Sequence, residues 1–119
     1  MNEVQMALRR YALAHKLAEE NPRLLLDAKT AAECTRVSKL CSQRMDECHA
    51  ADDALMVFVD HPLATPALKA FAAADSDKGC SSCWLSSKSN KDHPDCECKI
   101  YRWFECREAL VTEGFANNY

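Results

Sequence analysis

Glycine is scarce in this sequence, and its apolar residues never form a long uninterrupted run. Only Gly79 and Gly114 occur among the 119 residues. Two isolated glycines exclude a G-x-S-x-G nucleophile elbow, a phosphate-binding glycine loop and a dinucleotide-binding fingerprint. The best apolar run, residues 54–59, is far shorter than the ~20 residues that span a bilayer. Because the N-terminus also lacks the apolar core of a secretory signal, we expect a soluble, cytoplasmic protein without a membrane partner.

A strong charge of either sign is missing too. The formal net charge is −3, spread over both halves of the chain, so no basic half exists to attract phosphate backbones. Apolar residues make up 48% of the sequence and charged residues 28%, which is typical of globular proteins and argues against disorder. At this length we expect one domain, residues 1–119.

Few glycines and several capping signals predict an all-α fold, a small helical bundle of three to five helices with one long central helix. Asn2 is a suitable cap for a first helix that runs to about residue 20. Asn21-Pro22 then opens a short segment in which we expect residues 24–26, all leucine, to be buried. Thr65-Pro66 predicts another short helix to about residue 74, so the bundle is expected to occupy residues 1–74.

The long central helix is predicted from Thr30 and Glu33, which have the spacing of a capping box. From residue 34 to residue 59, apolar side chains fall within an arc of roughly 140°, which fits one amphipathic helix ending at Asp60, before a proline. Arg44 and Asp52 intrude on this apolar stripe, so a break near residues 49–53 is an alternative. A last helix is expected at residues 99–113, followed by a frayed tail.

Seven of the eight cysteines, all except Cys106, form two groups. Cys34, Cys41 and Cys48 recur every seven residues, which places them on one helix face about 10 Å apart. That separation is too large for one zinc ion or for a disulfide between neighbours. We interpret them as small residues in a helix–helix contact. The alternative, a Cu(I)-storing bundle, needs facing cysteines on the first helix, which has none.

The second group has the spacing of a metal site in a loop at residues 75–98. Cys80 and Cys83 form a C-x2-C turn, which lets two thiolates approach one tetrahedral ion, and Cys96 with Cys98 closes the site. We favour these four cysteines, and His93 in place of Cys98 is the alternative. Either set predicts a structural zinc ion, since four protein ligands leave no open coordination position. An iron–sulfur cluster or disulfides are the other interpretations.

Aromatic residues follow this loop directly. The segment of residues 100–104 is apolar nearly all round a helix, and Trp84 lies beside the C-x2-C turn. Aromatic and arginine side chains are the usual energetic anchors of protein interfaces. We therefore predict a partner-binding surface at Trp84, Tyr101, Arg102 and Phe104. The alternative is that Ile100 and Trp103 pack inward while the hydroxyl of Tyr101 reaches solvent.

These features predict a non-enzymatic, zinc-stabilised helical module that binds a partner protein in a regulatory role, as an adaptor or inhibitor. A nucleic-acid-binding zinc domain is the second hypothesis, because lysines such as Lys88 and Lys91 surround the loop. Interleaved acidic residues, including Asp92 and Asp95, cancel most of that positive field. A metal or thiol redox enzyme is the third, and we find no paired catalytic residues in the sequence that favour it.

Overall fold

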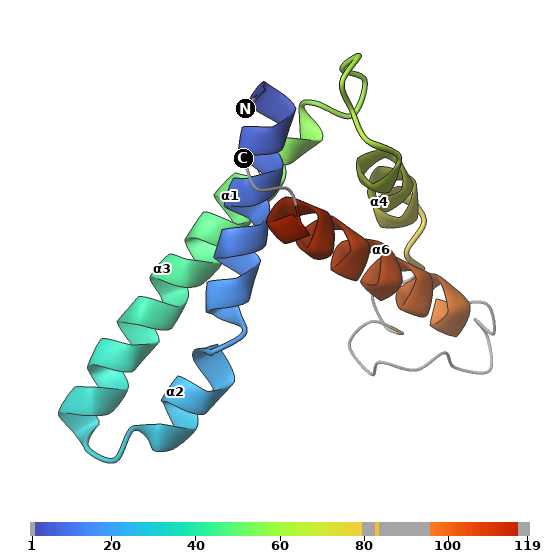
Figure 1. Ribbon diagram of the computed structural model, residues 1–119. Helices are drawn as coiled ribbons and strands as arrows, with labels where there is room; N and C mark the ends of the chain where they lie inside the picture. Colours follow the sequence, from blue (N-terminus) through green and yellow to red (C-terminus); the bar gives the residue numbers. More distant parts are fainter. Residues whose placement is uncertain (1, 80–82, 84–95, 117–119) are drawn as a thin grey trace.

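The structure is a computed structural model that describes residues 2–79, 83 and 96–116, and within these ranges the chain is helical and contains no strand (Figure 1). The expected all-α class is confirmed. Most of the expected metal-binding loop lies outside the described residues. No described helix is long and apolar enough to cross a membrane. The helices are α1 (Glu3–Ala18), α2 (Asn21–Asp27), α3 (Ala31–Met56), α4 (Pro66–Ser76) and α6 (Cys96–Ala116).

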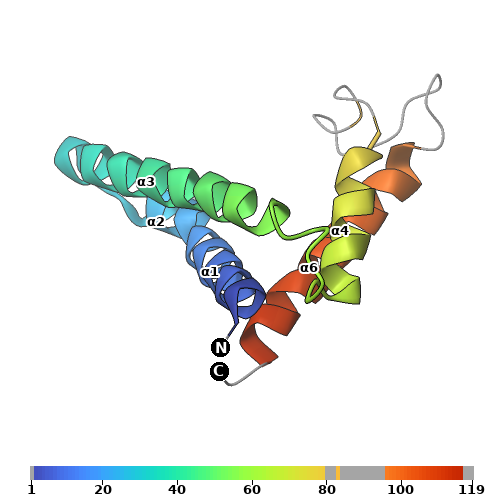
Figure 2. The ribbon, with the colours of Figure 1, turned by 90° about the horizontal axis from the view of Figure 1, so that it is seen from above.

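The helices form two arms that meet at α1. In the first arm, α1 and α3 run antiparallel, and the short α2 connects them at the far end; in the second arm, α4 and α6 run antiparallel (Figures 1 and 2). The most extensive helix contacts join α1 to α3 and α1 to α6. The molecule is consequently flat, with principal extents of 49 × 46 × 21 Å.

The main core lies where the two arms meet. It draws buried side chains from four helices: Val4, Leu8 and Tyr11 from α1, Leu55 from α3, Leu68 and Phe71 from α4, and Leu110 and Val111 from α6. A smaller cluster of Ala14, Cys48 and Ala51 continues along α1 and α3. Small residues at these positions let the two helix backbones approach each other closely.

Polar side chains begin α1 and α4 as the sequence predicts. Asn2 Oδ1 accepts a hydrogen bond from the Gln5 N–H at 2.8 Å, and Gln5 Oε1 accepts one from the Asn2 N–H at 2.9 Å. This is a complete capping box, with two backbone donors satisfied reciprocally. At α4, Thr65 Oγ1 accepts from the Leu68 N–H at 3.3 Å, and Pro66 occupies a position that needs no N–H partner.

The long helix α3 is continuous through residues 49–53 and ends at Met56, short of the predicted Asp60. Only half of its predicted capping box forms. Thr30 Oγ1 accepts from the Glu33 N–H at 3.1 Å, but the Glu33 carboxylate accepts from the Lys29 N–H at 2.8 Å instead of from Thr30. The Glu33 carboxylate therefore binds the backbone N–H one residue before the one that the capping box predicts.

Two predictions about local structure were wrong. Leu25 and Leu26, expected to be buried, are 48% and 78% exposed, because the seven-residue α2 packs mainly on α3 and leaves its outer side uncovered. The last helix is longer than the predicted range 99–113, since α6 begins at Cys96 and ends at Ala116. The expected frayed tail is thus helical as far as residue 116.

Gly114 explains why α6 continues. It is buried where α6 crosses α1, and a Cβ atom built on it would lie 2.6 Å from Ala12 Cβ and 2.6 Å from the Leu8 carbonyl oxygen. Only a residue without a side chain permits this backbone approach. The crossing joins the two arms, so Gly114 lies inside α6 because of a tertiary contact, although glycine often follows the last residue of a helix.

We predict that Gly114→Ala lowers the free energy of unfolding by about 2 kcal/mol, because the added methyl group must push the α1 backbone away. Urea denaturation followed by circular dichroism measures the change. The matched control is Ala109→Gly, at an exposed position of the same helix, where the loss of an alanine should cost about 1 kcal/mol. A Gly114→Ala variant as stable as the wild type would contradict the tight crossing.

Candidate functional site

A separate buried cluster surrounds the first turn of α6. Cys83, Cys96 and Ile100 are 0%, 6% and 5% exposed and pack against one another. Gly79, after the end of α4, adopts a φ of +90°, and a Cβ atom at this position would lie only 3.1 Å from the Cys96 sulfur. The start of α6 and the chain that leaves α4 therefore converge on the Cys96 thiol.

The structure brings together two of the predicted metal ligands, Cys83 and Cys96, and separates a third from them. Cys98 is exposed, because residues two apart on a helix lie about 200° apart around its axis. Cys80 and His93 lie outside the described residues. Within residues 2–79, 83 and 96–116, no group of three or more His, Cys, Asp and Glu side chains is placed to hold a metal ion.

Charged groups beside this cluster are largely paired. Lys99 Nζ lies 3.1 Å from Asp77 Oδ1, and Lys78 Nζ lies 3.6 Å from Asp75 Oδ1. Asp75 Oδ1 also accepts a hydrogen bond from Trp103 Nε1 at 2.9 Å. A groove of about 410 Å³ lies among these residues. Its lysines are thus neutralised locally, which argues against a strong phosphate-binding surface at this place.

The aromatic segment divides into an inner and an outer part. Ile100 is buried and Trp103 is half-buried, with its ring centroid 5.6 Å from that of Phe71. Tyr101 and Phe104 are 59% and 46% exposed, and Arg102 is exposed beside them. Trp84 lies outside the described residues. Ile100 and Trp103 thus pack inward, as in the alternative interpretation of the sequence, and Tyr101, Arg102 and Phe104 face solvent.

The three heptad-spaced cysteines lie apart from this cluster, on α3. Cys41 and Cys48 are buried, and the Cys48 thiol donates to the Ala14 carbonyl oxygen at 3.4 Å, whereas Cys34 is exposed. Burial raises the pKa of the Cys48 thiol, and the negative charge of Asp52 adds to this effect. Cys41 and Cys48 thus serve as small buried residues of a helix contact, as the sequence suggested, whereas this prediction was wrong for the exposed Cys34.

A polar network that sequence reasoning missed joins three helices. His15 of α1 contacts Asp52 of α3 through Nε2 at 2.9 Å and Arg107 of α6 through Nδ1 at 3.2 Å. This pattern fits a neutral imidazole that donates to Asp52 and accepts from Arg107. The ring also lies 4.2 Å from the Tyr11 ring, whose hydroxyl pKa is raised well above its usual value by burial and by Asp52.

Arg44 and Asp52, the two charged residues within the apolar stripe of α3, are the sequence features from which polar contacts between helices could have been predicted. Asp52 accepts the His15 contact, and Arg44 donates to the Leu17 carbonyl oxygen at 3.1 Å and to Glu20 at 3.3 Å. Arg44 thereby satisfies a carbonyl near the C-terminal end of α1, where a positive charge is favourable. Both side chains hold α1 against α3.

Of these features, the cysteine cluster and the neighbouring aromatic side chains offer the most chemistry for binding. Comparison with family models, with curated proteins and with solved structures finds no match for the chain. The chemistry of the described side chains is therefore the basis for assigning a function.

We expect Cys34 to react with iodoacetamide faster than Cys48 by roughly an order of magnitude or more, because the buried thiol is inaccessible and stays protonated. Below its raised pKa Cys48 is a neutral thiol, so its labelling should rise only as the solution becomes alkaline. Timed labelling at several pH values, followed by peptide mass spectrometry, measures both rates. In concentrated urea the two rates should converge, and equal rates in the folded protein would contradict the burial of Cys48.

Proposed function

We propose that the protein is a non-enzymatic interaction module, stabilised by one zinc ion, that binds a partner protein as an adaptor or inhibitor. The observation that carries this proposal is the burial of Cys83 together with Cys96 at the start of α6. Tyr101 and Phe104 project from the following turns of the same helix. An ion held at the first turn would stabilise the segment that presents these aromatic side chains.

The buried pair supports a zinc site in which His93 is the fourth ligand. Cys83 and Cys96 share one cluster, whereas Cys98 faces solvent on another side of α6. A single ion needs its sulfurs about 2.3 Å away, so Cys96 and Cys98 would serve the same ion only if the first turn of α6 unwound. The set Cys80, Cys83, His93 and Cys96 needs no such change in the described residues. Its spacing, C-x2-C-x9-H-x2-C, consists of two close ligand pairs joined by a loop, which is the general arrangement of structural zinc sites.

The exposed side chains of α6 support the protein-binding part of the proposal. Tyr101, Arg102 and Phe104 combine two aromatic rings with a guanidinium group, the residue types that most often dominate interface energies. The Phe104 ring contacts Trp103 edge-on at a centroid distance of 5.1 Å, and Trp103 is held by Asp75. Trp103, which is held by Asp75 of α4, therefore supports the Phe104 ring. This support reduces the conformational entropy that the Phe104 side chain loses on binding.

Native mass spectrometry of the purified chain should show one zinc ion per molecule, lost on treatment with a chelator. Cys83→Ser, Cys96→Ser and His93→Gln should each abolish stoichiometric zinc, because three remaining ligands hold the ion far more weakly. Cys98→Ser is the matched control and should keep one zinc. Loss of zinc from Cys98→Ser but not from His93→Gln would instead favour four cysteines. A metal-free chain with the mass of a disulfide-bonded form would overturn the zinc proposal.

For the binding function, we expect the double variant Tyr101→Ala with Phe104→Ala to weaken partner binding by tenfold or more without changing zinc content. The partner is first identified by cross-linking in cells that express the chain, and its affinity is then measured with purified proteins by calorimetry. Met45→Ala, an exposed apolar residue of α3, is the control. Unchanged affinity in the double variant would exclude this surface, and steeply salt-dependent binding to RNA or DNA instead of protein would favour the nucleic-acid hypothesis.

A further inference from the structure

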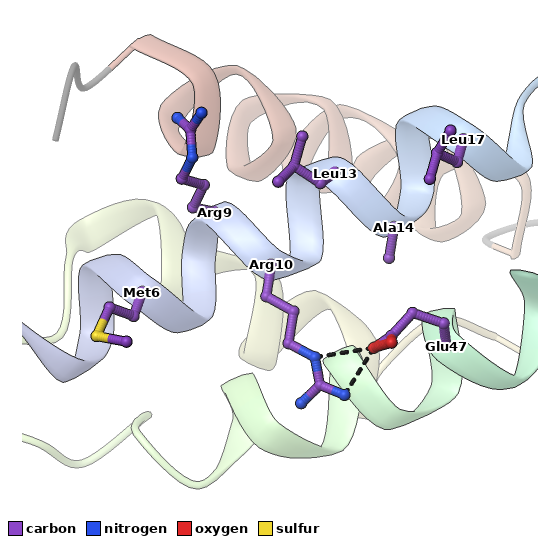
Figure 3. Close-up of a pocket in the computed structure, with 7 residues that line it drawn as sticks. All are labelled: Met6, Arg9, Arg10, Leu13, Ala14, Leu17 and Glu47. Carbon is purple, nitrogen blue, oxygen red and sulfur yellow. Dashed lines mark hydrogen bonds and ion pairs between the residues drawn. The ribbon is translucent and has the colours of Figure 1, made fainter.

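A groove of about 460 Å³ lies between α1 and α3 (Figure 3). These two helices form the arm away from the start of α6 (Figure 1). Its apolar lining comes from Met6, Leu13 and Leu17 of α1, which are 59%, 43% and 49% exposed. Arg10 reaches from α1 to Glu47 of α3 across one part of the groove, with Nε 2.8 Å from the carboxylate (Figure 3). The groove therefore has an apolar lining and a charged wall.

The apolar lining of the groove is a second apolar stripe on α1, separate from the face of α1 that is buried in the core. Residues 6, 13 and 17 are separated by seven and four positions, so they lie along one side of α1 over about 16 Å at 1.5 Å per residue. The core of α1, by contrast, is centred on Leu8 and Tyr11, nearly opposite around the helix axis. A linear apolar stripe of this length and spacing matches the anchors of one amphipathic helix laid into a groove.

The charge of α1 indicates the kind of helix that fits. Between Glu3 and Glu19 the helix contains Arg9, Arg10 and Lys16 and no acidic residue, although the whole chain has a net charge of −3. Arg10 is paired with Glu47, and Lys16 Nζ lies 3.5 Å from Glu19. Arg9, which also lines the groove, forms no ion pair within the described residues (Figure 3). The groove thus carries a local positive charge beside its apolar stripe.

We propose that this groove binds an amphipathic helix of a partner protein whose apolar anchors are flanked by acidic residues. Leucine-like anchors contact Met6, Leu13 and Leu17, and a carboxylate of the partner pairs with Arg9. A second copy of this chain fits less well, because an α1-to-α1 contact brings the positively charged Arg9 side chains of both copies to the same groove. A bilayer also fits less well, since anionic lipids repel a chain of net charge −3 and a flat surface does not fill a groove.

The probe for the test is a synthetic, fluorescently labelled helical peptide with leucines at i, i+3, i+7 and i+11 and glutamates beside them. A control peptide carries lysine in place of each glutamate. Fluorescence anisotropy with the full-length chain as purified should show binding of the acidic peptide and at least about tenfold weaker binding of the basic one. Acidic-peptide binding should weaken as salt rises, because the ion pair with Arg9 is exposed.

Variants of the chain locate the binding. Leu13→Gln should lower the affinity for the acidic peptide about tenfold, whereas Met45→Gln, an equally exposed apolar residue outside the groove, should leave it unchanged. Arg9→Glu should weaken the acidic peptide and strengthen the basic one, a reversal that a merely destabilised fold does not produce. Circular dichroism of each variant checks that the helices are retained.

Several results would overturn the proposal: no binding of the acidic peptide, equal loss in Leu13→Gln and Met45→Gln, or no reversal in Arg9→Glu. A dimer in solution that Leu13→Gln dissociates would assign the groove to a second copy. Binding to phosphatidylglycerol vesicles that Leu13→Gln abolishes would assign it to a membrane. The peptide test is independent of the zinc proposal, because chelator treatment and Cys83→Ser should leave peptide binding unchanged.

Discussion

The contact of α6 with α1 around Gly114 is the constraint on which the rest of the structure depends. Among the described residues, the core of the first arm alone is the small cluster of Ala14, Cys48 and Ala51. In the second arm, Leu68, Phe71, Leu110 and Val111 are buried in a core shared with α1. Leu110 and Val111 of α6 enter the core beside Leu8 because Gly114 lets the two backbones approach. The His15 network then fixes the orientation, since Asp52 and Arg107 hold one imidazole ring from two different helices. A shift of α6 along α1 would disturb the core and this network together.

Helix starts were predictable from the sequence where the deciding bonds are local. Asn2 with Gln5 and Thr65 with Leu68 are pairs three residues apart, so the residue types alone contain the signal. The C-terminal end of α6 was not predictable in this way. A glycine usually marks a helix end, but here its missing side chain accommodates Leu8 and Ala12, more than a hundred residues earlier in the chain. The exposure of Leu25 and Leu26 likewise depends on how little of α2 another helix covers.

The candidate metal site could be recognised from its cysteine spacing, but its ligand set could not. With the last helix expected to start near residue 99, Cys96 and Cys98 both belonged to a loop and were both free to turn toward one ion. Once α6 begins at Cys96, helical geometry separates the two side chains and gives them different burial. The groove on α1 was hidden for a related reason. Arg9 and Arg10 interrupt its apolar stripe, and only the pairing of Arg10 with Glu47 turns that interruption into one wall of a groove.

The flat arrangement of two arms also explains why so much apolar surface remains in contact with water. A helix buried on one side covers one stripe, so Leu40 and Met45 of α3 stay partly exposed. Apolar area that stays in water contributes little to the free energy of folding, but it contributes to the free energy of binding when a partner covers it. Any molecule that binds only the folded chain stabilises it in proportion to the logarithm of its concentration. A partner bound to either arm would therefore raise the free energy of unfolding of this small core. This applies both to the α6 surface and to the α1 groove.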